Sequence, residues 1–292
     1  MIDDKLVSHA EALIDALPFL QQLKGHQILV KIGGSVMEKE NLVEKLISDI
    51  VLLHTLEIHP VIVHGGGMTI SEQMRLAGLK PKFFNGLRIT DQETIAVVEN
   101  ALDNIVQPQI IQAIEALGAK SAGISGKSVF KATKLHISGE AGQEAPDLGF
   151  VGKVTQVNTS KISWAFGEGR IPIVSPLATN EASQVMNVNA DLAAGALAGE
   201  LGVIKCAYIS DVPGIMRNLN DKDSLISSIS LGMIEKLVQD GIIHGGMLPK
   251  VQSAKDALER GVKKVHFIDG RVTHALILEM LSSGGLGTQI AL

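Results

Sequence analysis

Residues 27–35, QILVKIGGS, and residues 59–67, HPVIVHGGG, share one pattern. Each contains a short apolar run, at 28–32 and at 60–64, and each apolar run leads into consecutive glycines. Between the two, apolar side chains recur through 42–53 with the spacing of a helix. A strand, a glycine turn, a helix and a second strand are typical of a parallel sheet, so we predict an α/β fold.

The second half of the chain repeats this alternation. We expect strands at 171–175, 204–210 and 265–268, and helices near 190–200, 231–240, 250–260 and 273–281. Residues 129–158 instead predict short strands of an antiparallel insertion, with turns at Gly139, Gly142, Gly149 and Gly152. No linker rich in Pro or Ser separates the halves, so we expect two lobes that share one sheet.

The composition excludes several classes of function. The chain has 292 residues, with 26 Lys and Arg against 31 Asp and Glu, and it contains no basic run. This balance argues against sequence-independent binding of nucleic acid or of an anionic membrane. Cys206 is the only cysteine, which excludes an intrachain disulfide framework and a cysteine-based zinc site.

The first residues predict an amphipathic helix over 3–17. Its apolar positions are Leu6, Ala10, Leu13, Ile14 and Leu17. Pro18 is expected to stop or kink this helix. The apolar stripe either covers the body of its own subunit or meets another copy of the chain. The start is acidic, where a leader would be basic, and no apolar run approaches the length of a membrane span, so we expect a cytoplasmic protein.

The two glycine loops indicate binding of phosphate. Glycine after a strand lets the backbone approach a ligand closely, and the next helix presents its positive end to an anion. Lys31 stands just before the first loop, which adds a cation. Two look-alikes are rejected. Gly126-Lys127-Ser128 lacks the earlier glycine of a P-loop, because Ser121 stands there, and the glycines at 167–169 lead to Pro172 and a strand, unlike a dinucleotide site.

Three polar motifs are further candidates. Arg88, in the segment 85–91, can hold a carboxylate through two parallel hydrogen bonds or form a surface ion pair. The segment 187–191 places two amides and a carboxylate before a helix, where Asn189 or Asp191 could serve only as a cap. Lys250 lies in the first turn of a predicted helix, which favours anions, so we expect an anion near it.

Six motifs in this order resemble the amino-acid kinase family. They are Lys-x-Gly-Gly (31–34), Val-His-Gly-Gly-Gly (63–67), Asn-Gly-Leu-Arg-x-Thr-Asp (85–91), Asn-x-Asn-Ala-Asp (187–191), Asp-Val-x-Gly-Ile (211–215) and Gly-Gly-Met-x-Pro-Lys (245–250). The similarity runs from about residue 17 to 292 and is greatest to members that phosphorylate N-acetyl-L-glutamate with ATP. It implies an open αβα sandwich with an N-terminal helix (1–23), an acetylglutamate-binding lobe (24–198) and an ATP-binding lobe (199–292).

The resemblance also implies a role for each motif. Lys31 and Lys250 would stabilise the transferring phosphoryl group and the leaving ADP oxygen, and Asp191 would lie between the two lysines. The amides that would line the phosphoryl path belong to Gly33, Gly34, Gly66 and Gly67. Arg88 would bind a carboxylate of acetylglutamate, and Asn187 its acetylamino group. The residues that would lie against the nucleotide are Asp211, Val212, Gly214 and Ile215. Mg²⁺ would be held mainly by ATP oxygens, with no metal site of the protein's own.

Two further features resemble the arginine-inhibited, hexameric members of that family. The N-terminal helix resembles helices that interlace between dimers, which implies a homohexamer built as a trimer of dimers. His266, Glu279 and Gly285 match positions that bind the arginine effector, although His266 could also be an ordinary buried strand histidine. Phe19 stands where many such members have Tyr, so one hydroxyl is missing from that site.

Two other functions stay open from the sequence. A kinase of the acetylaminoadipate type would use a substrate one methylene longer, which a pocket discriminates only weakly. A non-catalytic sensor of amino acid or nucleotide would have the same fold but no need of both lysines and Asp191.

Overall fold

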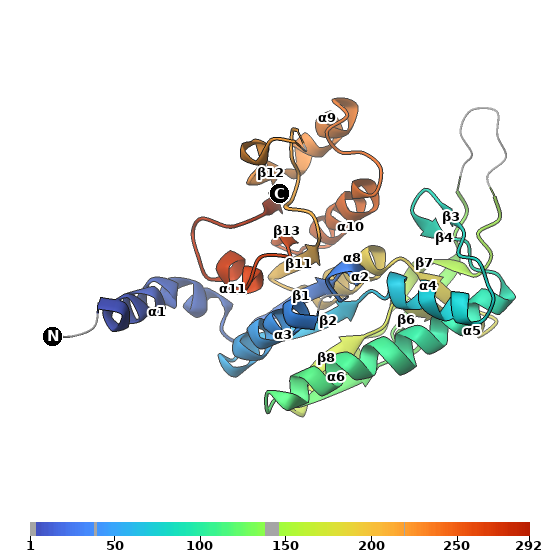
Figure 1. Ribbon diagram of the computed structural model, residues 1–292, viewed down its shortest axis with the longest axis horizontal. Coiled ribbons are helices and arrows are strands. Elements are labelled where there is room, and N and C mark those ends of the chain that lie inside the picture. The colour runs from blue at the N-terminus through green and yellow to red at the C-terminus, as the bar shows by residue number, and fades with distance from the viewer. Residues whose placement is uncertain (1–3, 38–39, 138–145, 219) are drawn as a thin grey trace.

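The computed structural model describes residues 4–37, 40–137, 146–218 and 220–292. Its centre is one eight-stranded sheet in the order β12-β14-β13-β11-β1-β2-β8-β5 (Figure 1). The strands are β1 (Gln27–Ile32), β2 (His59–His64), β5 (Ser121–Ile124), β8 (Ile171–Val174), β11 (Lys205–Ser210), β12 (Ser228–Ser230), β13 (Lys264–Asp269) and β14 (Thr288–Ala291). All neighbours are parallel except β13 and β14, so the predicted, largely parallel α/β sheet is confirmed.

Helices cover both faces of this sheet. Alternate side chains of a strand point to opposite faces, so each strand contributes to two cores. In β1, Ile28 and Val30 pack in the core that contains α3 (Glu40–Thr55), α6 (Gln107–Ala116) and α11 (Ala275–Met280). Leu29 packs in the other core, with α7 (Ser160–Gly167), α8 (Ala190–Leu201) and α10 (Met247–Glu259). This three-layer arrangement is the expected αβα sandwich.

The insertion at 129–158 is confirmed as antiparallel, and it is part of a larger unit. Strands β6 (Phe130–Lys134) and β7 (Val151–Val157) pair antiparallel and close a four-stranded barrel with β9 (Leu177–Thr179) and β10 (Val185–Val188). Gly149 has φ +69°, and a Cβ there would lie 2.2 Å from the Thr90 carbonyl oxygen. The turn expected at Gly152 is wrong, because that glycine lies inside β7. Gly139 and Gly142 lie outside the described residues.

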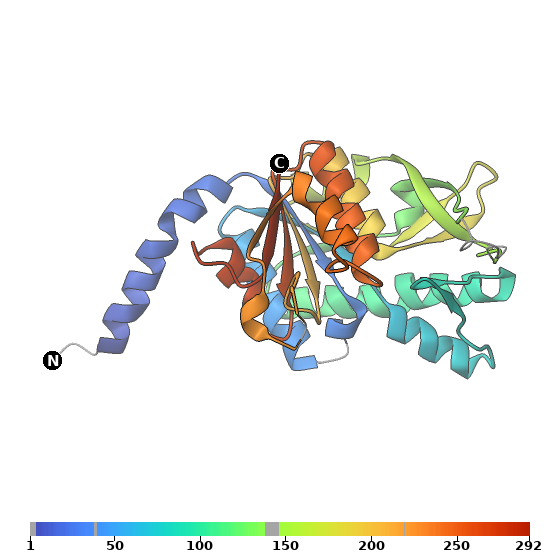
Figure 2. The same ribbon diagram turned by 90° about the horizontal axis from the view of Figure 1, so that it is seen from above.

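Helix α1 (Asp4–Leu23) continues past Pro18, so of the two expectations for this proline, a stop or a kink, the stop is wrong. Figure 2 shows α1 extending away from the body, where water can satisfy the carbonyl that lacks a donor. Leu13 and Ile14 are 71% and 67% exposed, so the apolar stripe does not cover its own subunit. Only the end of α1 is anchored, through the buried side chain of Leu23.

β1 and β2 lead into α2 (Gly34–Met37) and α4 (Gly67–Leu76). Further elements are the hairpin β3 (Phe83–Phe84) and β4 (Leu87–Arg88), α5 (Gln92–Asn100), a π-helix (Ala101–Val106) and, in the second half of the chain, α9 (Ile234–Gln239). The predicted helices of the second half match α8, α9, α10 and α11 with shifted ends. Among the described residues, no helix has both the length and the apolar character that a membrane span requires.

Candidate active site

The two glycine loops touch at the carboxyl edge of the sheet. β1 and β2 are parallel neighbours, so Gly33-Gly34 and 65–67 emerge side by side. The Gly65 amide donates to the Ile32 carbonyl at 2.8 Å. A Cβ on Gly34 would lie 3.1 Å from the Gly67 nitrogen, so a side chain at Gly34 would crowd the contact between the loops. The loops therefore form one surface.

The structure corrects the expectation for one of the four glycine amides. The Gly33 N–H donates to the Ile209 carbonyl of β11 at 2.9 Å, so it is unavailable to a phosphate. Gly34 and Gly67 are the first residues of α2 and α4, and an amide in that position has no acceptor within its own helix. A Cβ on Gly66 would lie 2.7 Å from Leu102 Cδ2, so the loop lies closely over the π-helix.

Lys31, Asp191 and Lys250 form a cluster beside these loops. Lys31 Nζ lies 2.7 Å from Asp191 Oδ1, and Lys250 Nζ lies 2.8 Å from Asp191 Oδ2. Asn189 caps α8, because its side chain accepts from the Asp191 and Leu192 amides at 2.9 and 3.2 Å. Asp191 therefore does not cap the helix. Its carboxylate lies beside Lys250, where an anion was expected because Lys250 lies in the first turn of a helix.

The cluster has one positive charge more than it has negative charges. Burial lowers the pKa of Lys31, and repulsion by Lys250 acts in the same direction against the attraction of Asp191. Burial alone would raise the Asp191 pKa, but the attraction of Lys31 and Lys250 outweighs it, so this pKa is lowered and the carboxylate stays ionised. An incoming anion would neutralise the surplus charge, so the cluster favours anionic ligands.

Two residues that the sequence reasoning missed, Ser253 and Tyr208, position the backbone of Asp191. The Ser253 hydroxyl donates to the Asp191 backbone carbonyl, and Tyr208 Oη lies 2.6 Å from Ser253 Oγ. Ser253 follows Lys250 by one turn of α10, and a Cβ on Gly195 of α8 would lie only 2.3 Å from its Oγ. The close packing of α8 on α10 therefore fixes the distance between Asp191 and Lys250. That Tyr208 is the only tyrosine of the chain was the one sequence feature that could have drawn attention to these two residues.

Arg88 is buried, so the surface ion pair considered from the sequence is wrong. Its Nη2 donates to the Gly67 carbonyl and to Ser71 Oγ, both at 2.8 Å. The guanidinium carbon lies 4.6 Å from the centre of the Phe83 ring. No carboxylate pairs with Arg88 among the described residues, and burial lowers its pKa. A buried cation without a counter-ion favours an anionic ligand.

A cavity of about 440 Å³ joins these groups. The polar and glycine residues that line it and that the sequence singled out are Lys31, Gly34, Gly66, Gly67, Arg88, Asn187 and Asp191. Asn187 donates through Nδ2 to Thr90 Oγ1 at 3.1 Å, which orients its amide. The volume of the cavity suits a small molecule with two or three polar groups, one of them anionic.

The segment 211–215 lies next to this centre, at the end of β11. β1 and β11 are parallel neighbours, with Ile32 opposite Ile209, so this segment begins beside the first glycine loop. Ile215 is buried and donates its amide to Thr288 Oγ1 at 2.8 Å. Asp211 is exposed at the start of the segment.

The candidate effector residues border a second cavity, of about 410 Å³, which also contacts Phe19 at the end of α1. His266 Nδ1 lies 2.7 Å from Glu279 Oε1, and both side chains are buried. Burial lowers the pKa of His266. Burial alone would raise the Glu279 pKa, but hydrogen bonds from His266 and from backbone amides lower it. A Cβ on Gly285 would lie 3.2 Å from Glu279 Oε2. The structure thus brings His266, Glu279 and Gly285 together.

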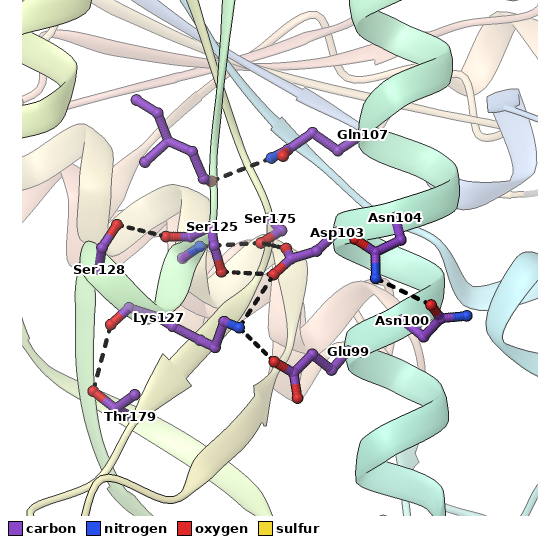
Figure 3. Close-up of polar contacts among 12 residues, drawn as sticks. Glu99, Asn100, Asp103, Asn104, Gln107, Ser125, Lys127, Ser128, Ser175 and Thr179 are labelled. Carbon is purple, nitrogen blue, oxygen red and sulfur yellow. Dashed lines mark hydrogen bonds and ion pairs between the residues drawn. The ribbon is translucent and has the colours of Figure 1, made fainter.

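A separate polar network joins the π-helix to the ends of β5 and β8 (Figure 3). Asp103 accepts hydrogen bonds from Ser125 Oγ at 2.7 Å and from Ser175 Oγ at 2.6 Å. Lys127 pairs with Glu99 and lies 3.6 Å from Asp103. The lysine of the rejected P-loop look-alike is therefore used in an internal ion pair. No sequence signal identified this network, because its members come from three separate segments, 99–103, 125–127 and 175.

Comparison with known proteins assigns the chain to a family. The family model described as "Amino acid kinase family" matches residues 27–269. The chain belongs to that family and is a kinase, which takes ATP as its phosphoryl donor.

The relatives that match nearly the whole chain are named acetylglutamate kinase. That of Akkermansia muciniphila is 46% identical over 98% of this chain and 96% of its own length. That of Aquifex aeolicus is 42% identical over 99% of both chains.

Solved structures share the fold at lower identity. N-acetylglutamate synthase from Neisseria gonorrhoeae matches 97% of this chain with a TM-score of 0.82 and 23% identity, and this chain spans 63% of that longer protein. Carbamate kinase from Giardia lamblia matches 91% of this chain and 98% of its own, with a TM-score of 0.67 and 17% identity. At these identities the likeness shows the fold alone.

Proposed function

We propose that this kinase transfers the γ-phosphoryl group of ATP to the side-chain carboxylate of N-acetyl-L-glutamate. The products are ADP and N-acetyl-L-glutamyl 5-phosphate, an intermediate of arginine biosynthesis. The observation that carries the proposal is the Lys31–Asp191–Lys250 cluster beside a cavity lined by Arg88, which has no carboxylate partner among the described residues. The names of the relatives that match the whole chain support the choice of substrate.

Catalysis in this site is mainly electrostatic. The acceptor carboxylate oxygen attacks the γ-phosphorus as the bond to the bridging oxygen of ADP breaks, and no side chain acts as a nucleophile. Lys31 stabilises the transferring group, and Lys250 stabilises charge on the leaving oxygen. Asp191 fixes both ammonium groups before substrate arrives, so little reorganisation is needed during the reaction. The amides of Gly34 and Gly67 supply further donors to the phosphoryl oxygens.

The cavity supplies recognition of the acceptor. Arg88 binds the carboxylate that does not react, since its guanidinium is already oriented by Gly67 and Ser71. Asn187, oriented by Thr90, binds the acetylamino group. Arg88 and Asn187 thus hold acetylglutamate at two different points, which directs its side-chain carboxylate toward the γ-phosphoryl group of ATP.

We place the nucleotide against 211–215, with Mg²⁺ bound chiefly to ATP oxygens. Both oxygens of the Asp191 carboxylate already contact lysines, so this group is not free to ligate a metal. No cluster of three His, Cys, Asp or Glu side chains arranged for a metal occurs in the described part of the chain. Bound Mg²⁺ would neutralise charge on the triphosphate.

Regulation by arginine and assembly into a hexamer are also part of this proposal. The cavity at the end of α1 contains a buried carboxylate, Glu279, which suits a cationic amino acid. The exposed stripe with Leu13 and Ile14 suits contact with another copy of the chain, as in a trimer of dimers. A cytoplasmic location stays a prediction from the sequence.

A coupled assay of ADP release tests the proposal. We expect ADP release that depends on N-acetyl-L-glutamate and is at least tenfold less efficient with N-acetyl-L-aminoadipate, since one methylene is worth about 1–3 kcal/mol. The reverse preference would identify the acetylaminoadipate-type kinase. Binding of the acyl amino acid without phosphoryl transfer would identify a sensor.

A further inference from the structure

Thr288 lies fully buried at the start of β14, where it joins two regions of the C-terminal half. It pairs with Phe267 of β13, and its Oγ1 accepts the Ile215 amide at 2.8 Å. Gly214 has φ +142°, and a Cβ there would lie 2.5 Å from Thr288 Oγ1. The end of the segment 211–215 therefore packs directly against the Thr288 side chain.

The residues just before Thr288 are fixed from the other side. Glu279 Oε2 accepts the amides of Leu286 and Gly287, the latter at 3.2 Å, while Glu279 Oε1 contacts His266. A Cβ on Gly287 would lie 1.9 Å from the Phe267 carbonyl oxygen, so the backbone passes closely against β13 there and only glycine fits. Residues 286–288 are a short bridge, with Glu279 at one end and Ile215 at the other.

We propose that Thr288 is a positioning residue for the nucleotide. Its hydroxyl fixes the segment 211–215 in the conformation that binds ATP and ties that segment to Glu279 in the second cavity. This inference rests on the proposed role of 211–215 in nucleotide binding. Thr288 itself touches no substrate, and it acts through the Ile215 amide.

The effect should be confined to the nucleotide. Without the hydroxyl, the buried Ile215 amide loses its acceptor, so the segment shifts to find another. The acetylglutamate cavity does not include Thr288 or 211–215 among its described lining residues, so binding of the acyl amino acid should not change.

Binding of ADP by isothermal titration calorimetry, in the full-length protein without acetylglutamate, tests the inference. We expect Thr288→Val, which keeps the shape but removes the hydroxyl, to weaken ADP binding about tenfold, as the loss of one buried hydrogen bond does. Thr288→Ser, which keeps the hydroxyl, should bind ADP within about twofold of the wild type. If Thr288→Val does not fold, Thr288→Ala is measured by the same criteria.

Thr90→Val is the matched control, since it removes the hydroxyl of another buried threonine, one that contacts Asn187 in the acetylglutamate cavity. It should raise the KM for acetylglutamate and leave ADP binding unchanged. Unchanged ADP binding in Thr288→Val, or equal weakening in Thr288→Val and Thr288→Ser, would overturn the inference. So would an equal rise of both KM values in Thr288→Val.

These results separate the inference from the proposed function. A wild-type protein that binds ADP but does not phosphorylate acetylglutamate refutes the proposed substrate and leaves Thr288 testable by calorimetry. An active enzyme whose ADP affinity is indifferent to Thr288→Val refutes the inference alone.

Discussion

Lys31 and Lys250 contact opposite oxygens of one carboxylate, Asp191 Oδ1 and Oδ2, at 2.7 and 2.8 Å. Lys31 lies near the end of a strand in the first half of the chain, and Lys250 lies in a helix of the second half. One acidic side chain thus sets the separation of the two cations. Because like charges repel, neither lysine would keep this position without Asp191.

Removing either cation should reduce turnover strongly. We expect Lys31→Ala and Lys250→Ala each to lower kcat by about a hundredfold or more, because one oriented charge at the reacting centre is worth about 2.7–4 kcal/mol. Circular dichroism controls for folding. Turnover close to the wild type in both variants would contradict the proposed mechanism.

Neutralising the shared carboxylate should lower stability as well as activity. Asp191→Asn leaves the buried Lys31 ammonium and the partly buried Lys250 ammonium without their shared counter-ion. Breaking a buried pair in this way costs about 3–5 kcal/mol. Urea denaturation measures the loss. The double variant Asp191→Asn with Lys31→Met should recover part of it, since one of the repelling charges is gone. If the double variant is less stable than Asp191→Asn, repulsion is not the cause.

Replacing the Arg88 guanidinium should weaken binding of acetylglutamate and leave binding of ATP unchanged. Arg88→Lys keeps the charge but cannot hold a carboxylate through two parallel bonds, so the KM for acetylglutamate should rise at least about tenfold while that for ATP changes little. Steady-state kinetics with each substrate varied in turn decides this. Equal changes in both constants would assign Arg88 a structural role.

Removing α1 should separate assembly from catalysis. Deletion of residues 1–22 is expected to convert a hexamer into an active dimer and to weaken inhibition by arginine, with the acetylglutamate KM unchanged in the absence of arginine. Ile14→Asp places a charge on the exposed stripe and should act likewise, whereas Glu11→Gln should not. Light scattering and an arginine titration are the measurements. A hexamer that survives the deletion would show that α1 is not an assembly element.

A buried histidine should make stability depend on pH. Burial lowers the pKa of His64 to about 4, and its Nε2 has no hydrogen-bond partner among the described residues. In the unfolded chain the pKa is about 6.5, so between these values only the unfolded state binds the proton. The stabilising contribution is therefore complete above about pH 6.5 and falls as the pH drops toward 4, by about 2 kcal/mol at pH 5.

Chemical denaturation at about pH 7.5 and pH 5 tests this linkage. The loss of stability between the two pH values should be smaller in His64→Gln than in the wild type by about 2 kcal/mol. His9→Gln, at an exposed position of α1, is the control and should leave the loss unchanged. The same loss in wild type and His64→Gln would contradict the prediction.

Local sequence patterns predicted the α/β fold and the two glycine loops, together with Lys31 beside the first loop. Short apolar runs identify β1 and β2, and glycines that directly follow a strand are recognised as a loop from the adjacent sequence alone. The Lys31–Asp191 contact came from resemblance, since no spacing relates positions so far apart. Gly33 shows the limit of local reasoning, because its amide is used by Ile209, a partner set by the pairing of β1 with β11.

Residues with a supporting role could not be predicted in this way. Tyr208, Ser253 and Thr288 are single hydroxyl groups in apolar surroundings, and hydroxyls of that kind are common in any core. Their function depends on which backbone group from another element lies opposite. That information arises only when α8 packs on α10, or β14 pairs with β13.

The position of β1 in the sheet also determines when the site is assembled. β1 pairs with β2 on one side and with β11 on the other. During synthesis β2 follows after two helices, α2 and α3, whereas β11 begins only at Lys205. The strand that carries Lys31 therefore keeps an unpaired edge until more than two-thirds of the polypeptide has been synthesised. Closure of this long-range pairing is slow compared with local contacts, and a chain arrested before it exposes an edge that other chains can join.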